Sequence, residues 1–415
     1  MDISTTSTLS PILRVHLSVV ASIVLLGWTT VATQPTATLT RAALFPLILL
    51  PTLYTALHAH EAGPVQLWNV YLGMMFGSHF AFNIFHILFL SGSTYTPPES
   101  SSSTWTDKLA FMLDTAINKR RINRPDQTRN IPPYSPPSKR RFLLSRSARL
   151  LALYLTLDIL TSHSLPNPHI TCAPGQDRIL HRLLSHSLSL PAALELLGII
   201  TGYALGGIIG LSACYDLASI VLVGCGLSEP RDWPPFFADP REAYSIRRFW
   251  GVFWHQALRI VLVSFAEWGV HSVLRLPRTK RGEKENGEET LGARCVRVVA
   301  RYLKLMIALL LSGAMHLVSD RAHGVEPWES GSIKFFFLQG MGMVVEDCVE
   351  GAYRHFKGTR RGEKKQKPAV WIRIVGFLWV GTFMVFTAPT WGFPVLRKGE
   401  TDDVVPVRIV GRFIQ

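Results

Sequence analysis

A histidine in an otherwise apolar segment is the residue of this sequence best suited to chemistry. His316 follows a stretch without charged residues, from 305 to 315. Ionisable groups are costly inside a membrane, so a histidine held there is a functional candidate by default. A neutral imidazole at that depth would act as a general base, because its pKa lies near working pH. The alternative is a structural histidine that forms a hydrogen bond to a neighbouring helix.

A second group of residues combines positive charge with tryptophan between positions 244 and 255. Arg247 and Trp254 are seven residues apart and would share one helical face, with Trp250 and His255 close by. An arginine beside tryptophans suits a ligand with phosphate and adenine groups, through charge-assisted hydrogen bonds and stacking. The alternative is an aromatic anchor at the membrane interface, and the spacing favours neither interpretation.

Three further polar residues recur along one face of an apolar segment: His79, Asn83 and His86. They would line a tunnel for a substrate or form hydrogen bonds between helices, and the second role is the more common one. Asp320 follows His316 at the H-x-x-x-D spacing that soluble acyltransferases use. We expect Asp320 instead to cap the helix end or to pair with Arg321.

These residues lie in or beside segments long enough to cross a bilayer. The chain is 48% hydrophobic and only 17% charged, and the charges gather in a few loops. A spanning helix needs roughly 20 predominantly apolar residues. The segments that approach this length are 12–31, 42–59, 65–91, 146–165, 192–224, 251–274, 298–318, 332–350 and 370–390.

Three basic loops set the predicted orientation. Residues 107–149, 275–304 and 354–373 are rich in lysine and arginine, which places them in the cytosol. The first loop is also rich in proline and serine, so we expect little regular structure in it. If the first two loops are both cytosolic, an even number of segments must cross between them. Three apolar segments lie there, so one of them does not cross, and 251–274 is polar and rich in tryptophan. We therefore expect 251–274 to be interfacial or re-entrant.

The sequence thus predicts an all-α, polytopic integral membrane protein with about eight crossings. The long segment 192–224 is rich in glycine, which is typical of close helix packing. The predicted regions are N-terminal transmembrane helices (1–106), a basic cytosolic loop (107–149), further transmembrane helices (150–227), a catalytic region (228–350), and a basic loop with a last transmembrane helix (351–415).

Composition also excludes several other classes. The net charge of +14 does not indicate nucleic-acid binding, because the basic residues flank apolar spans. The five cysteines contain no C-x-x-C pair, so neither a disulfide framework nor a metal site is expected. A transporter of the inverted-repeat type would show paired broken helices. No such repeat is evident.

The motifs around these residues carry a resemblance to a known family. The string Ser245-x-Arg247-x-Phe249-Trp250-Gly251-x-x-Trp254-His255 resembles the signature of the wax synthase-like branch of the membrane-bound O-acyltransferases. The downstream Ser312-Gly313-x-x-His316 resembles that family's catalytic-histidine helix, and 335–347, which contains Gln339, is similar to the helix that follows. These matches fall within 228–350.

The resemblance implies transfer of an acyl group from coenzyme A to a lipophilic alcohol. His316 would be the catalytic base, and no bound cofactor would be needed beyond acyl-CoA as co-substrate. Arg247, Trp250, Trp254 and His255 would contact acyl-CoA or shape its tunnel. His79, Asn83 and Gln339 are candidates to line the tunnel.

Two subclasses of the family remain possible on the motifs alone. True wax synthases use long acyl chains and long alcohols, whereas a fungal group is associated with acetylation of terpenoid or meroterpenoid hydroxyls in secondary metabolism. The basic loop and the segment 231–237 look more like the second group, so we expect an O-acetyltransferase of an endoplasmic reticulum membrane. A long-chain wax ester synthase and a non-catalytic transporter are the alternatives.

Overall fold

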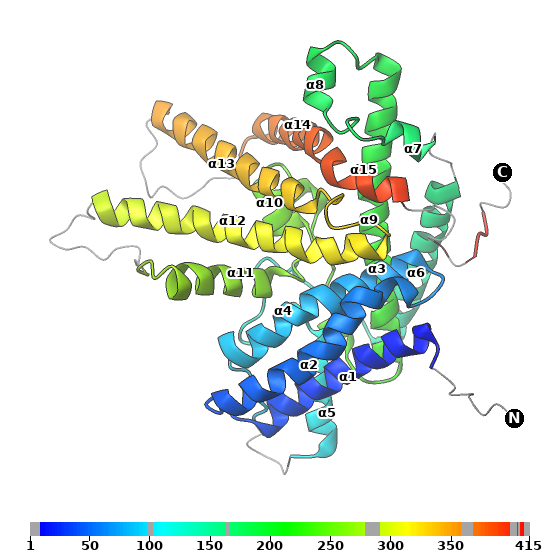
Figure 1. Cartoon of the computed structure of the whole chain (residues 1–415), viewed down its shortest axis with the longest axis vertical. Coiled ribbons are helices and arrows are strands. Elements are labelled where there is room, and N and C mark those ends of the chain that lie inside the picture. The colour runs from blue at the N-terminus through cyan, green and yellow to red at the C-terminus, as the bar shows by residue number, and fades with distance from the viewer. Residues whose placement is uncertain are drawn as a thin grey trace, which may run out of the picture.

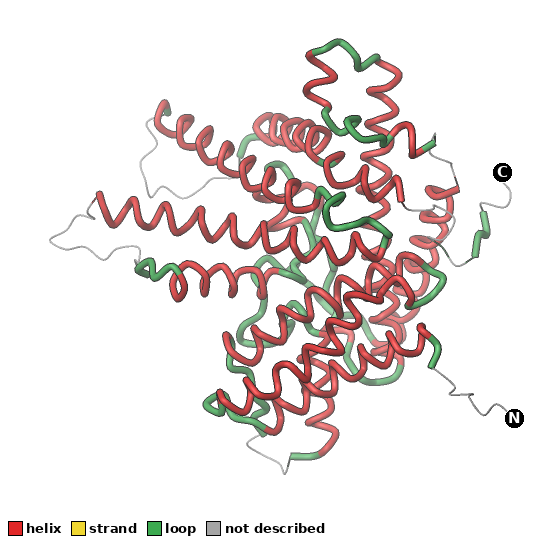
Figure 2. Tube along the Cα trace, in the orientation of Figure 1, coloured by secondary structure: helices red, strands yellow, loops and turns green. Residues whose placement is uncertain are grey.

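The computed structural model describes residues 9–97, 103–162, 167–278, 291–357, 368–398, 405 and 407–410. Within these residues the chain contains helices and loops and no β-strand (Figure 2). The predicted all-α membrane architecture is therefore confirmed. Positions 280–290 and 358–366 of the predicted cytosolic loops lie outside the described residues.

The N-terminal helices form one group, drawn in blue and cyan in Figure 1. Arg41 is fully buried within it and donates hydrogen bonds to Thr33 and to the carbonyl oxygens of Leu88 and Ser93. These bonds join the end of the first helix, the start of the second and the end of the third span. The elements are α1 (Pro11–Ala32), α2 (Thr38–His58), η1 (Ala59–Glu61), α3 (Gln66–Leu72), η2 (Gly73–Ser78), α4 (His79–Phe85), η3 (His86–Leu90) and α5 (Trp105–Ile117).

The third span is a continuous helix that contains two π-helical turns, η2 and η3. Such turns carry one extra residue and are frequent at functional sites. They flank α4, which carries the predicted tunnel residues. The span also packs on the C-terminal half of α12 (Leu291–Ala322), because Ser78 donates a hydrogen bond of 2.9 Å to the Met315 carbonyl.

The middle of the chain is built around one very long helix. The elements are α6 (Lys139–Ser162), α7 (Pro168–Thr171), α8 (Ile179–Leu184) and α9 (Leu190–Gly224). The 35 residues of α9 correspond to a length of about 52 Å, well beyond the ~30 Å hydrocarbon core. Five of its glycines have open space within 4 Å of the point where a Cβ atom would lie, so close packing within this chain does not explain them: Gly198, Gly202, Gly206, Gly207 and Gly224.

The C-terminal part brings three helices side by side: α11 (Arg259–Trp268), α12 and α13 (Ser332–Phe356) (Figure 1). A short connecting region precedes them and two helices follow. The remaining elements are η4 (Pro230–Asp232), η5 (Pro240–Glu242), α10 (Ile246–Arg248), η6 (Phe249–Phe253), η7 (Gly269–Val273), α14 (Val370–Thr387) and α15 (Pro389–Lys398).

Six helical segments of the described chain are long and apolar enough to cross a membrane: Pro11–Ala32, Thr38–Glu61, Gln66–Leu90, Leu190–Gly224, Leu291–Ala322 and Val370–Thr387. The described part of the predicted span 146–165 and the predicted span 332–350 are helical but are not in this set. A total of eight crossings therefore stays a prediction. The segment 251–274 is not in the set either. Its helical part, the ten residues of α11 and five of η7, reaches about 22 Å, which fits the expectation that it does not cross.

The expectation of little regular structure in 107–149 holds for 118–138, which contains the Pro/Ser-rich stretch, and is wrong for the two ends of the region. Helix α5 occupies the first part of this region, and α6 begins at Lys139. Between them, Arg120 is buried and donates hydrogen bonds to the carbonyl oxygens of Pro234 and Pro235, at 3.0 and 2.8 Å. The basic segment therefore folds back into the protein, because its guanidinium groups satisfy backbone acceptors there.

A close backbone contact positions the helix that carries His316. A methyl group at Gly313 would lie 2.8 Å from the Ile333 Cα atom, so only glycine permits this approach of α12 to α13. Ser332 donates a hydrogen bond of 3.0 Å to the Gly313 carbonyl at the same level. The two helices are thus held together one turn before His316.

We expect Gly313→Ala to disturb this contact. The added methyl group must push α13 away, which should lower the midpoint of thermal unfolding and weaken any activity that depends on His316. Gly351→Ala on α13 is the matched control, because a methyl group there has open space. Thermal unfolding of both purified variants checks the expectation, and equal midpoints would contradict it.

Candidate active site

His316 is held in a defined orientation and tautomer. Its Nδ1 atom lies 2.7 Å from the Ser312 carbonyl oxygen, which only accepts, so Nδ1 carries the proton and donates. The Nε2 atom forms no hydrogen bond to any residue that the structure describes, which leaves its lone pair available. The rings of Phe336 and Trp391 lie 4.9 and 4.8 Å from the imidazole. A neutral imidazole with a free Nε2 in an aromatic enclosure can accept a proton from a hydroxyl group.

Asp320 does not contact His316, although both lie on α12. Its carboxylate accepts hydrogen bonds from the Trp391 indole, at 2.9 and 3.1 Å, and from the Ser330 hydroxyl at 2.5 Å. Neither the predicted helix cap nor a pair with Arg321 describes this arrangement. Asp320 instead fixes the tryptophan whose ring packs edge-on against His316, a residue to which no sequence motif drew attention.

The aromatic residues of the segment that contains α10 and η6 pack beside the rings that surround His316. The Trp250 indole donates to Gln339 at 3.1 Å, and the Gln339 amide donates to the Thr387 hydroxyl at 3.1 Å. Trp250 also packs against Phe336, with ring centroids 5.5 Å apart. The candidate residues Trp250 and Gln339 are therefore part of the structure that surrounds His316.

The two adjacent arginines are already paired with carboxylates. Arg247 donates to Asp347 at 2.8 Å, and Arg248 pairs with Glu242. Glu346 accepts the backbone N–H groups of Ile246 and Arg247, at 2.5 and 3.1 Å, and so anchors α10 to α13. A phosphate at Arg247 would have to replace Asp347, and the role of Arg247 in donor binding stays a prediction.

His255 lies close to His316 and among aromatic rings. Its ring stacks on Phe236, with centroids 5.0 Å apart, and lies 5.5 Å from Trp254. Burial, with smaller effects of His316 and Arg120, lowers the pKa of His255 to about 3. The imidazole is therefore neutral at any physiological pH.

His79 and His86 do not form the expected hydrogen bonds between helices. Both side chains are buried, at 1% and 4% exposure, and neither ring nitrogen of either residue has a partner among the described residues. Asn83 is buried on the same span. His79 interacts electrostatically with Lys119 and His255, so the polar face of the third span is turned toward the site.

Lys119 was not identified by sequence reasoning. Its ammonium group is buried without a hydrogen-bond partner in the described chain and lies over the rings of Phe80 and Phe76, at 4.5 and 5.5 Å. Burial, with the nearby Arg121, lowers the pKa of Lys119 to about 7. The one available signal was the run of three basic residues, 119–121, which positive-inside logic assigns to solvent.

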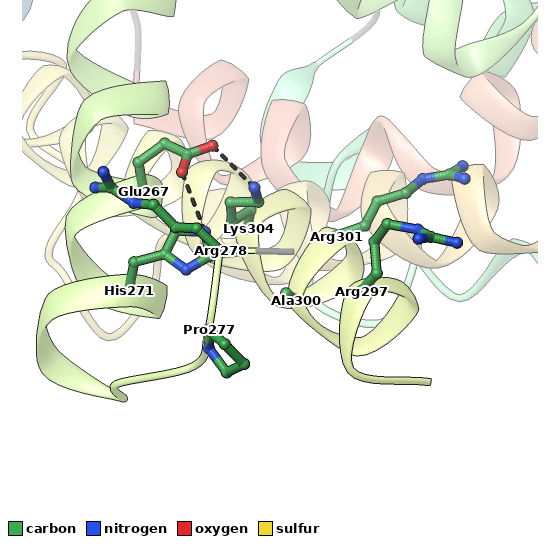
Figure 3. Close-up of a pocket in the computed structure, with 8 residues that line it drawn as sticks. All are labelled: Glu267, His271, Pro277, Arg278, Arg297, Ala300, Arg301 and Lys304. Carbon is green, nitrogen blue, oxygen red and sulfur yellow. Dashed lines mark hydrogen bonds and ion pairs between the residues drawn. The ribbon is translucent and has the colours of Figure 1, made fainter. Parts of the chain in front are cut away.

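A second basic site lies at the far end of α11 and α12 (Figure 3). It is a cavity of about 370 Å³ lined by Glu267, His271, Pro277, Arg278, Arg297, Ala300, Arg301 and Lys304. Glu267 pairs with Lys304 at 2.9 Å and with His271 at 3.3 Å. Lys304 is twelve residues from His316 on α12, or about 18 Å along the axis, so this cavity is separate from His316.

The described residues contain no group of three or more His, Cys, Asp or Glu side chains placed to hold a metal ion. The chemistry available at the site is thus that of an imidazole base, an aromatic enclosure, and a buried array of neutral imidazoles and cations.

A histidine whose Nε2 has no partner among the described residues lies among aromatic rings in a multi-pass helical protein, an arrangement that suits a membrane enzyme. Residues 233–338 match the membrane bound O-acyl transferase family. The chain is 32% identical to the acetyltransferase ataH of Aspergillus terreus over 284 residues, which cover 66% of this chain and 85% of that protein. It belongs to the membrane-bound O-acyltransferase family.

Two other relatives agree. The acetyltransferase pyr8 of Aspergillus fumigatus is 29% identical, over 75% of this chain and 70% of its own length. The acetyltransferase atnC of an Arthrinium species is 28% identical, over 76% and 68%. The family resemblance predicted from the motifs is therefore confirmed.

We expect Asp320→Ala to lower turnover without abolishing it. The substitution leaves the Trp391 indole without a partner, at about 1–3 kcal/mol for a buried group, and lets Trp391 leave the imidazole. The Ser330 hydroxyl keeps Ser332 as a partner. Asp320→Asn keeps the shape and one acceptor oxygen, so it should retain more turnover. Steady-state rates at matched protein level check this order. Equal loss in both variants would show that the negative charge, and not the position of Trp391, is what matters.

Proposed function

We propose that the protein is an acyl-CoA-dependent O-acetyltransferase that acetylates a hydroxyl group of a lipophilic terpenoid or meroterpenoid in secondary metabolism. The observation that carries the proposal is the tautomer of His316, with Nδ1–H bound to Ser312 and Nε2 free. The names of the relatives, each an acetyltransferase, support the acetyl group.

The reaction follows from this geometry. Nε2 of His316 takes the proton of the acceptor hydroxyl while its oxygen attacks the thioester carbonyl carbon. The C–S bond then breaks, and the departing thiolate takes up the proton held by His316. The imidazole returns to its first state and no other reactant is needed. The aromatic rings of Phe336 and Trp391 exclude water, which would otherwise compete with the alcohol for the acetyl group.

The same site chemistry would serve a wax ester synthase, which is the second candidate within the family. The two differ in the length of the acyl chain that the enzyme accepts. The endoplasmic reticulum is the proposed location, because acyl-CoA and a lipophilic acceptor would meet at its cytosolic leaflet.

The first test compares acyl donors in membranes that contain the protein. We expect mass spectrometry to detect acetyl esters of added terpenoid alcohols with acetyl-CoA, and little product with palmitoyl-CoA. Membranes without the protein are the control. Faster formation of palmitoyl esters would support a wax ester synthase, and no ester with any donor would support the transporter alternative.

The second test removes the base. His316→Ala should lower kcat by about 10²–10⁴-fold, the usual contribution of general-base catalysis, with little change in protein level. His316→Gln should be nearly as inactive, because an amide retains a hydrogen bond but cannot accept the proton. His355→Ala, at an exposed position of α13, is the matched control. Turnover of His316→Ala close to that of the unmodified protein would overturn the assignment.

A further inference from the structure

Several buried nitrogen atoms lack hydrogen-bond partners in the part of the chain that the structure describes. Among them are Nζ of Lys119, both ring nitrogens of His79 and of His86, and Nδ1 of His255; the others are Nδ1 of His323 and Nε of Arg373. A buried polar group without a partner costs free energy, and protein structures tolerate few of them. Their occurrence on neighbouring residues indicates that a polar ligand meets them when the protein is at work.

These residues form a series that leads away from His316. His255 interacts electrostatically with His316, and His79 with both His255 and Lys119. Lys119 in turn interacts with Arg121. Arg121 lies 3.8 Å from Asp126, whose side chain is 59% exposed, so the series ends at the protein surface.

Two further guanidinium groups lie beside this series, and their hydrogen-bond partners in the described chain are neutral oxygens. Arg120 binds the carbonyl oxygens of Pro234 and Pro235, and Arg259 binds the Gly251 carbonyl at 3.1 Å and an amide oxygen at 3.0 Å. Neither guanidinium group contacts a carboxylate of the described residues. The Lys119 ammonium is held only by the faces of Phe76 and Phe80.

We infer that this series, the polar passage of His255, His79, Lys119 and Arg121, binds the coenzyme A portion of the acyl donor. The inference rests on the proposed function. A thioester, two amides and a group of phosphates follow one another along acyl-coenzyme A. With the thioester at His316, the passage presents imidazoles that can donate to amides and accept from them, and then cations for phosphates. Lys119 is the residue that holds phosphate oxygens.

The basic cavity of Figure 3 is the competing location for the phosphates. Its cations are largely paired within the protein, since Lys304 binds Glu267 and Arg301 binds Asp347. It also lies on α12, well beyond the turn that carries His316. The unpaired ammonium of Lys119 therefore favours the polar passage.

Binding of desulfo-coenzyme A, which carries no thioester, tests the inference without turnover or an acceptor. Isothermal titration of the purified full-length protein should show a Kd about 10- to 100-fold higher for Lys119→Met, the loss expected for a charge-assisted hydrogen bond. Methionine still packs on the phenylalanine rings. Lys119→Arg should stay within a few-fold of the unmodified protein, because it keeps the charge.

Lys108→Met is the matched control, since Lys108 also lies over an aromatic ring of α5, 5.0 Å from Trp105, but outside the passage. An unchanged Kd for Lys119→Met in a protein with normal thermal unfolding would overturn the inference. So would loss of binding by Arg278→Ala alone, which would place the phosphates in the cavity of Figure 3. His316→Ala should bind desulfo-coenzyme A normally, so failure of the proposed function is a separate outcome.

Discussion

Within a bilayer, a polar side chain can be satisfied only by the protein itself or by what the protein binds. Most of the polar residues in the described part of this chain follow that constraint closely. Arg41 holds three backbone segments together, Asp320 holds Trp391, and Glu346 anchors α10. Against this background, the free Nε2 of His316 and the unpartnered nitrogens of His79 and Lys119 are distinctive. Satisfied groups build the scaffold, and the substrate sites that we propose lie at some of the groups without partners.

The scaffold places the groups without partners on different elements. His316 is carried by α12, which Gly313 brings against α13, and His79 lies on the third span. The hydrogen bond from Ser78 to the Met315 carbonyl holds the third span against α12. In the proposed reaction, the acceptor hydroxyl and the donor thioester would meet at His316, between helices that this hydrogen bond and the close approach at Gly313 hold together.

Sequence reasoning singled out His316 because ionisable residues are rare in apolar segments. The motif around it resembles the motif of a known family. Sequence reasoning also recovered Trp250 and Gln339, which the structure brings together. It missed Lys119 and Trp391 for different reasons. The charge of Lys119 indicated a solvated loop. The positive-inside rule predicts which side of the membrane a loop occupies, but not whether the loop folds back into the protein. Trp391 contacts His316 only because α15 returns to the site after the last span, and no local pattern reports a long-range contact of that kind.

The π-helical turns of the third span have a consequence for how this protein can change over time. Each turn accommodates one extra residue without adding a helical turn. Loss of that residue from η2 would return the segment to regular α-helix and leave the rotational phase of α4 nearly unchanged. Loss of one residue from α4, which is regular α-helix, would instead rotate the residues on either side of it by about 100° relative to each other. The span can therefore lose a residue at η2 or η3 at a cost that its α-helical parts do not allow.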